Sequence, residues 1–155
     1  MAEDGTIYYL RQAEDLILYI EGEITSPLAQ GMFAHIEPEL DPPAFSRVFA
    51  ELSGASYVDS TTIGTFIKLK KILERDNGRL FICNLSPKVR RILSDMHLLS
   101  YFAVAEIRAI SEIRREVLTE IAPERRDLLS AEYLLDAHNA IIQEAPHLQA
   151  EFESL

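Results

Sequence analysis

The chain has 155 residues, of which 48% are hydrophobic, and a formal net charge of −10. That apolar content is sufficient for one packed domain and excludes a wholly disordered chain. The acidic balance argues against nucleic acid and anionic membranes as partners, because both attract basic surfaces. The N-terminus has no signal-peptide pattern, and no apolar run approaches the roughly 18 residues of a membrane span. We therefore expect a cytosolic protein with protein partners.

Hydrophobic periodicity and helix-start signals divide the first part of the chain into alternating strands and helices. In chain order, the predicted elements are a hairpin of strands at 7–11 and 16–24, a helix from Thr25-Ser26-Pro27 to before Pro38, a strand at 47–52, a helix from Ser60 to Asp76, a strand at 80–83, a helix from Ser86-Pro87, a strand at 103–107, and a helix capped by Ser111 that carries Ile113, Val117 and Ile121. This order predicts an α/β domain whose later strands are parallel.

The C-terminal segment differs from the domain in charge and pattern. We place the domain at residues 1–122 and a helical extension at 123–155, with one helix expected over 124–145. The extension holds seven acidic and two basic residues. Its helix has more than one apolar stripe, one of them containing Leu134, Ala137 and Ile141, whereas a lone surface helix needs a single stripe. We infer that it packs on its own domain and also contributes to a homodimer or partner surface; a helix that only completes the core is the alternative.

The most informative segment is residues 57–64, where a strand leads into the helix that begins with Ser60. Backbone N–H groups at a helix start point outward and favour negative charge, so a phosphate on Ser60 would be stabilised there. We expect Ser60 to act as a neutral helix cap when it is unmodified. Thr61 is the alternative phosphoacceptor. Asp59 either orients the hydroxyl or binds magnesium during phosphoryl transfer, or it caps the helix.

The segment Leu52 to Ser60 resembles a STAS domain of the bacterial anti-sigma factor antagonist type, in which an Asp-Ser pair opens the second helix. Gly22-Glu23-Ile24 and the passage from Cys83 to Val89 are similar to further signatures of that family, and the likeness covers roughly residues 6–120. Two positions depart from the pattern, since Thr62 replaces a usual glycine and Thr25 a usual aspartate. A threonine at position 62 adds bulk beside Ser60.

The resemblance implies a mixed four- to five-stranded sheet with helices mainly on one face, plus the C-terminal helix. It also implies a partner switch in transcription control. The unphosphorylated chain would bind an anti-sigma factor serine kinase, and phosphorylation of Ser60 would release it. We expect the switch site and partner surface to comprise Asp59, Ser60, Thr61, Thr62, Gly64, Glu23 and Thr25.

Two alternatives keep the fold and remove the switch: an accessory subunit of a transport ATPase, and a scaffold in a sensory assembly. An enzyme is not expected, because the sequence has no glycine-rich phosphate loop and no nucleophile-elbow motif. We expect no cofactor and no metal, since the four histidines lack ligand spacing.

Lys68, Lys70 and Lys71 form either a solvated helix face or a contact for an acidic partner. Cys83, inside an apolar run, is expected to be a buried structural residue.

Overall fold

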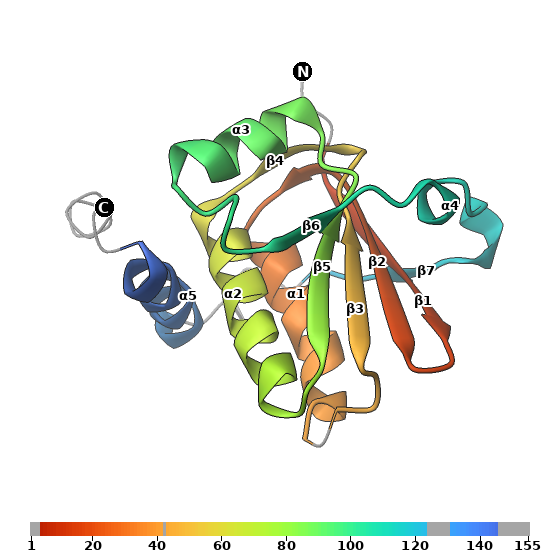
Figure 1. Cartoon of the computed structure of the whole chain (residues 1–155), viewed down its shortest axis with the longest axis horizontal. Helices are drawn as coiled ribbons and strands as arrows, with labels where there is room; N and C mark the ends of the chain where they lie inside the picture. The colour runs from red at the N-terminus through yellow and green to blue at the C-terminus, as the bar shows by residue number, and fades with distance from the viewer. Residues whose placement is uncertain (1–3, 42, 124–130, 146–155) are drawn as a thin grey trace.

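The computed structural model describes residues 4–41, 43–123 and 131–145, and they form one α/β unit (Figure 1). The parts of the expected C-terminal helix and extension at 124–130 and 146–155 lie outside the described residues. The strands are β1 (Thr6–Gln12), β2 (Asp15–Ile24), β3 (Arg47–Glu51), β4 (Ala55–Val58), β5 (Arg79–Cys83), β6 (Ala103–Ala105) and β7 (Thr119–Ile121). The helices are α1 (Ser26–Ile36), α2 (Ser60–Arg75), α3 (Pro87–Asp95), α4 (Arg108–Ser111) and α5 (Ala131–Glu144), with 3-10 turns at Glu37–Glu39 and Arg115–Val117.

The strands form a mixed sheet in the order β6-β5-β3-β2-β1-β7, with β4 pairing separately with β2. The predicted hairpin is present as the antiparallel pair β1–β2, and β2, β3, β5 and β6 are parallel neighbours. The predicted fold class is therefore confirmed. The sheet has seven strands instead of four or five, because the short strands β4 and β7 were not predicted.

A bend in β2 positions the start of α2. The first half of β2 pairs with β3, and its last three residues pair with β4, with a register shift between Gly22 and Glu23. Gly22 has a φ of 77°, a left-handed conformation that glycine adopts without the steric penalty of a side chain. The bend brings the end of β2 beside β4, and both strands then lead directly into helices.

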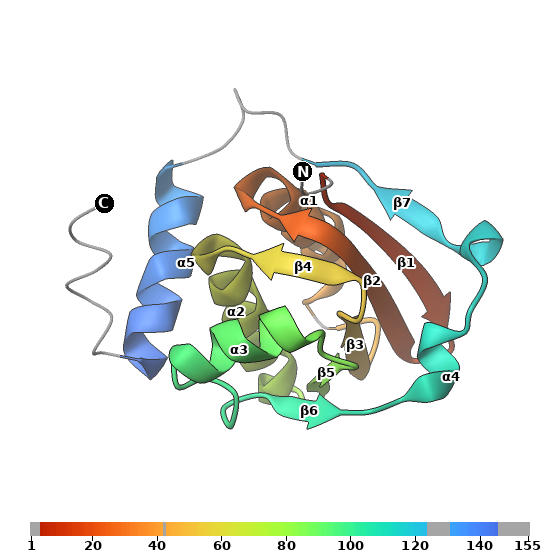
Figure 2. The same ribbon diagram turned by 90° about the horizontal axis from the view of Figure 1, so that it is seen from above.

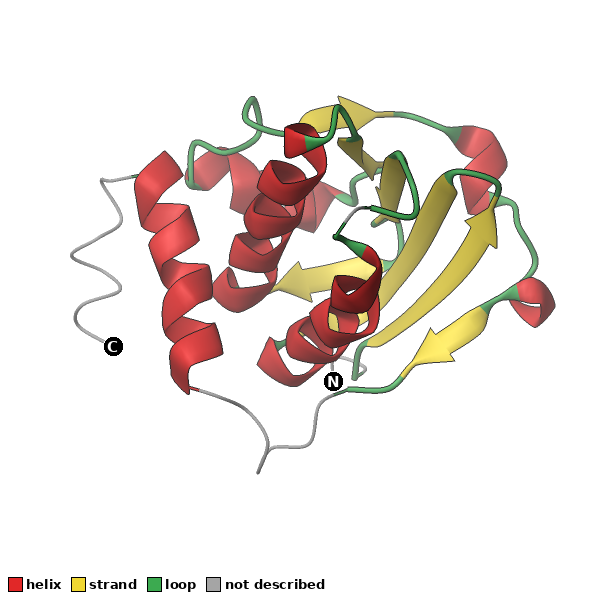
Figure 3. Ribbon diagram, turned by 90° about the horizontal axis from the view of Figure 1, so that it is seen from below, coloured by secondary structure: helices red, strands yellow, loops and turns green. Residues whose placement is uncertain are grey.

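The longer helices gather on one side of the sheet (Figure 3). The main hydrophobic core lies between the sheet and helices α1 and α2, and it includes residues from α5. A smaller cluster on the opposite face contains Ile17, Tyr19, Phe49, Cys83 and Ile110. Cys83 is fully buried there, and burial raises the pKa of its thiol to about 12, which keeps it protonated and poorly nucleophilic.

The prediction of a helix that begins after Ser111 is wrong. Ser111 is instead the last residue of the four-residue helix α4, and the chain ends this region as strand β7. Ile121 pairs with Ile7 on the exposed edge of β1 and is 3% exposed, whereas Val117 is 56% exposed. Pairing satisfies the backbone groups of an edge strand and buries Ile121, and local helical spacing does not offset that gain.

Within the described ranges, none of the helices combines the length and apolar character needed to cross a membrane.

Candidate functional site

Asp59 caps helix α2, and Ser60 is the first residue inside it. The Asp59 carboxylate accepts hydrogen bonds from the Thr62 backbone N–H at 2.9 Å and from the Thr62 hydroxyl at 2.8 Å. The prediction that Ser60 caps the helix is therefore wrong. Because aspartate supplies the cap, the Ser60 hydroxyl is left to make a different contact.

The starts of α1 and α2 are hydrogen-bonded to each other. The Ser26 hydroxyl lies 3.3 Å from Asp59 Oδ2 and 3.1 Å from Thr61 Oγ1. Thr61 is only 3% exposed, while Ser60 is half-buried. Of the two candidate phosphoacceptors, Ser60 is thus the more accessible, since a kinase has to reach the oxygen directly.

Thr62 faces the interior, where it is fully buried and bonded to Asp59. Its side chain strengthens the cap and adds no bulk to the outer surface beside Ser60. The Thr62 hydroxyl donates a hydrogen bond to Asp59 that a glycine at this position could not make.

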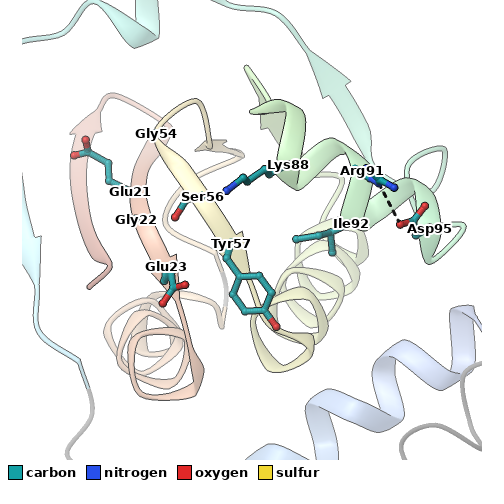
Figure 4. A pocket seen from close by; sticks show the side chains of 10 residues that line it. All are labelled: Glu21, Gly22, Glu23, Gly54, Ser56, Tyr57, Lys88, Arg91, Ile92 and Asp95. Atoms are coloured by element: carbon teal, nitrogen blue, oxygen red, sulfur yellow. Dashed lines mark ion pairs between the residues drawn. The ribbon is translucent and has the colours of Figure 1, made fainter. Parts of the chain in front are cut away.

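Glu23 and Thr25 lie at the end of β2, on the sheet side of the site. Thr25 is exposed and precedes α1 without a side-chain capping bond. Glu23 lies opposite Tyr57 in the β2–β4 pair and lines an open groove of about 910 Å³ between these strands and α3 (Figure 4). Acidic and basic side chains both line this groove, among them Glu21, Glu23, Lys88, Arg91 and Asp95. Most of the predicted site residues thus lie in the first turns of α2, whereas Glu23 lines this groove and Thr25 precedes α1.

Helix α5 packs directly against the start of α2. Ser60 Oγ and His138 Nε2 share a hydrogen bond of 3.0 Å, in which the histidine tautomer decides which atom donates. One turn further along α2, Gly64 touches the backbone of α5 so closely that an added Cβ would lie 2.2 Å from the Ala137 carbonyl oxygen. The prediction that the C-terminal helix packs on its own domain is confirmed for α5.

Two of the three lysines on α2 form ion pairs with α5. Lys68 Nζ lies 2.7 Å from an Asp136 carboxylate oxygen, and Lys71 Nζ lies 2.9 Å from Glu144. Lys70 instead pairs with Glu74 on its own helix. The acidic surface that meets Lys68 and Lys71 therefore belongs to the same chain. A homodimer through this helix stays a prediction, and Leu135, on its outer side, is 61% exposed.

Tyr133 connects α5 to both α1 and α2. Its hydroxyl lies 2.6 Å from Thr65 Oγ1 and donates to the Ala29 carbonyl at 3.2 Å. Burial raises the pKa of Tyr133 to about 12, and the hydrogen bond from Thr65 opposes that shift. The phenol is held neutral because its ionised form would lose hydration in this contact.

Tyr133→Phe is expected to lower the free energy of unfolding by about 1 kcal/mol at neutral pH, the usual net value of one hydrogen bond. In the parent chain, the folded state holds the Tyr133 proton more tightly than the unfolded state, whose pKa is near 10. Stability from this group is therefore complete below pH 10 and declines as pH rises from 10 towards 12. Urea unfolding across that range should show a shallower decline for Tyr133→Phe; equal slopes would contradict this role.

Sequence reasoning missed His138 and Tyr133 as members of the site. They lie 78 and 68 residues from their partners Ser60 and Thr65. The apolar stripe of Leu134, Ala137 and Ile141 was the one available signal, since it predicted a packed helix without naming its partner. In the part of the chain that is described, no group of three or more His, Cys, Asp or Glu side chains is placed to hold a metal ion.

Comparisons with known proteins agree on the family and the fold. The STAS domain family model matches residues 8–122. BtrV of Bordetella bronchiseptica, which is classed as an anti-sigma factor antagonist, is 29% identical over 93 residues, covering 60% of this chain and 79% of BtrV.

Two solved structures share the fold at 20% identity. They are the unphosphorylated anti-sigma factor antagonist SpoIIAA, with a TM-score of 0.59 over 69% of this chain and 93% of that one, and the phosphorylated Bacillus cell fate determinant SpoIIAA, with a TM-score of 0.56 over 70% and 99%. At this identity the likeness establishes the fold alone.

Proposed function

This chain belongs to the STAS domain family, and from that membership we propose that it is a cytosolic anti-sigma factor antagonist that works by partner switching. In its unphosphorylated form it binds an anti-sigma factor that is also a serine kinase, and the sigma factor is freed. The kinase then phosphorylates Ser60 and the complex dissociates. The chain supplies the accepting hydroxyl and a binding surface, and catalysis comes from the partner.

The observation that carries this proposal is the position of Ser60. It is the first residue of α2, directly after the Asp59 cap, and is half-buried at the edge of the domain. A phosphate here meets the outward N–H groups and positive end of a 16-residue helix, so the fold tolerates it. The neighbouring residue Thr61 is buried and engaged with Ser26.

The charge of the modification provides the switch. Phosphorylation adds about −1.5 to −2 charges to a surface that already carries Asp59 and, across the β2–β4 end, Glu23. A partner surface shaped for a neutral hydroxyl loses both its fit and its electrostatic match. A coupling of about 1–3 kcal/mol between modification and binding changes affinity about 5–150-fold, which is sufficient to separate the two proteins.

The relatives support this reading. BtrV is classed as an anti-sigma factor antagonist, and SpoIIAA has been solved in both unphosphorylated and phosphorylated forms. The groove lined by Glu23 and Tyr57 adjoins the end of β4, and Tyr57 is two residues before Asp59. We assign it to the same partner surface, because Tyr57 is 45% exposed there and exposed aromatic side chains are common anchors in protein interfaces.

The test is incubation of the full chain with its cognate kinase and ATP, followed by mapping of the phosphate by mass spectrometry. We expect one phosphate, on Ser60. Ser60→Ala should remain unlabelled, and Ser111→Ala, which removes an exposed serine on α4, should be labelled like the parent chain. Labelling of Thr61 would move the switch by one residue, and absence of label at both positions would overturn phosphorylation.

Isolation of the native complex distinguishes the two non-switching alternatives. A switch protein copurifies with a serine kinase. A subunit of a transport ATPase copurifies with that ATPase, and a sensory scaffold elutes as a large oligomer. Either of the last two results, together with an unlabelled Ser60, would replace the proposed function.

A further inference from the structure

We propose that α5 is an intramolecular cover for Ser60, and that the kinase reaches the serine only after α5 has moved away from α2. The regulatory meaning of this cover rests on the proposed function, since a covered serine matters only if it is a phosphoacceptor. The cover itself follows from contacts between α2 and α5.

The first observation is that α5 crosses α2 beside Ser60. Figures 1 and 2 show the two helices crossing, with α5 outside α2 and away from the sheet. The closest approach is at Gly64 and Ala137, where backbone meets backbone. Ser60 and Gly64 are four residues apart and share one face of α2. The face that presents the serine is therefore the face that α5 occupies.

The second observation is that His138 already occupies space next to the reacting oxygen. Its Nε2 is 3.0 Å from Ser60 Oγ. For phosphoryl transfer, the phosphorus atom has to approach that oxygen to about 3–3.5 Å with a defined line of attack. A kinase active site also has to surround the serine, and the α5 backbone at Ala137 lies one turn away. The docked helix therefore obstructs the approach.

The third observation is that α5 is held by one face only. Ala137 and Ile141 are fully buried, and Ala140 is 7% exposed, while Asp136 on the rim is largely exposed. The ion pairs of Lys68 and Lys71 are partly solvated, and such pairs contribute little to stability. Besides the two hydrogen bonds of Tyr133, α5 adds only a few apolar side chains to a core that is built mainly by the sheet, α1 and α2, so it can detach while the rest of the domain stays folded.

The fourth observation is that α5 lies beyond the family match. The matched region ends at residue 122, and α5 begins at Ala131. The cover is thus an addition to the STAS domain, and it is placed on the helix that carries the candidate phosphoacceptor.

Thiol labelling tests the cover without a kinase. Ser60→Cys places a nearly isosteric thiol under α5 in the full chain, and its rate of reaction with 5,5′-dithiobis(2-nitrobenzoic acid) reports accessibility. Adding Ile141→Asp puts a carboxylate into the docked face. We expect labelling to be about tenfold to a hundredfold faster, because burial of an isoleucine favours the docked state by roughly that factor.

The control is Leu135→Asp, which adds the same carboxylate on the outer side of α5, where Leu135 is 61% exposed. It should leave the labelling rate of Ser60→Cys unchanged. Cys83 reports on the domain, since it is fully buried in the cluster on the opposite face of the sheet. It should stay unlabelled in every variant. If Cys83 reacts in the Ile141→Asp chain, Ala137→Leu is used instead of Ile141→Asp. This uncharged substitution displaces α5 by steric overlap at the helix crossing.

Equal labelling of the Ser60→Cys thiol alone, with Leu135→Asp and with Ile141→Asp would overturn the cover, whatever the kinase does. With Ser60 restored and the kinase identified as above, Ile141→Asp should be phosphorylated faster than the parent chain by a similar factor. Faster thiol labelling with an unchanged phosphorylation rate would overturn the regulatory role. Faster thiol labelling with no phosphorylation of any chain would support the cover and overturn the proposed function.

Discussion

Ser60→Asp is expected to fold like the parent chain and to bind the kinase about 5–150-fold more weakly, whereas Ser60→Ala should bind at least as tightly and never be released. Aspartate at the first position of α2 is compatible with the helix, since negative charge there contributes about 0.3–1 kcal/mol of stabilisation. Against the partner the same charge meets a surface shaped for a neutral hydroxyl. Calorimetric titration with the kinase measures the affinity of the parent, Ser60→Asp and Ser60→Ala chains, and urea unfolding measures their free energies of unfolding.

Ser111 provides the matched control for this experiment. It is exposed on α4, and its hydroxyl donates only to the nearby Arg108 carbonyl. Ser111→Asp adds the same charge away from α2 and should leave affinity unchanged. Equal binding by Ser60→Asp and Ser60→Ala would refute the charge mechanism, because the two differ chiefly in charge at that position.

Gly64→Ala is expected to destabilise the chain by about 1–3 kcal/mol, the range for overpacking a close contact. Helix propensity alone predicts the opposite sign, since alanine is favoured over glycine within a helix by about 1 kcal/mol. The tertiary contact decides, because the new Cβ would lie 2.2 Å from the Ala137 carbonyl oxygen and 2.9 Å from its Cα. These are backbone atoms, so the strain is relieved only if α5 moves.

Gly54→Ala is the matched substitution at an open position. A Cβ there would first meet the Glu21 side chain at 3.2 Å, and that flexible chain can turn aside. We expect a change within about 0.5 kcal/mol, as for most surface substitutions. Denaturant unfolding of both variants measures the contrast. A Gly64→Ala chain more stable than the parent would show that α5 is not docked on α2 in solution.

The lysines of α2 link the cover to partner binding. In the docked state Lys68 and Lys71 are paired with Asp136 and Glu144. When α5 leaves, both lysines become available to the kinase, about two and three turns along the same helix from Ser60. An acidic partner surface would then take the place of the acidic face of α5, so that helix displacement and partner binding would favour one another.

Local sequence signals predicted the domain well where chain neighbours decide the structure. Proline after a capping residue marked the starts of α1 and α3, and apolar spacing marked α2. They failed where pairing with a distant segment decides. Ile113, Val117 and Ile121 have helical spacing, yet Ile121 forms strand β7 because the edge of β1, more than a hundred residues earlier, requires a partner.

By itself, the sequence determined the α/β class, the STAS-like order of elements, and the placement of an Asp-Ser pair at the start of a helix, because these depend on periodicity, capping and short motifs. Only the tertiary structure decided that Asp59 is the cap, that Thr61 and Thr62 are buried, and that His138 and Tyr133 join the site. The physical reason is distance along the chain. An amphipathic helix encodes its need for a partner but not the partner's identity, and α2 becomes that partner because Gly64 allows the backbone of α5 to approach.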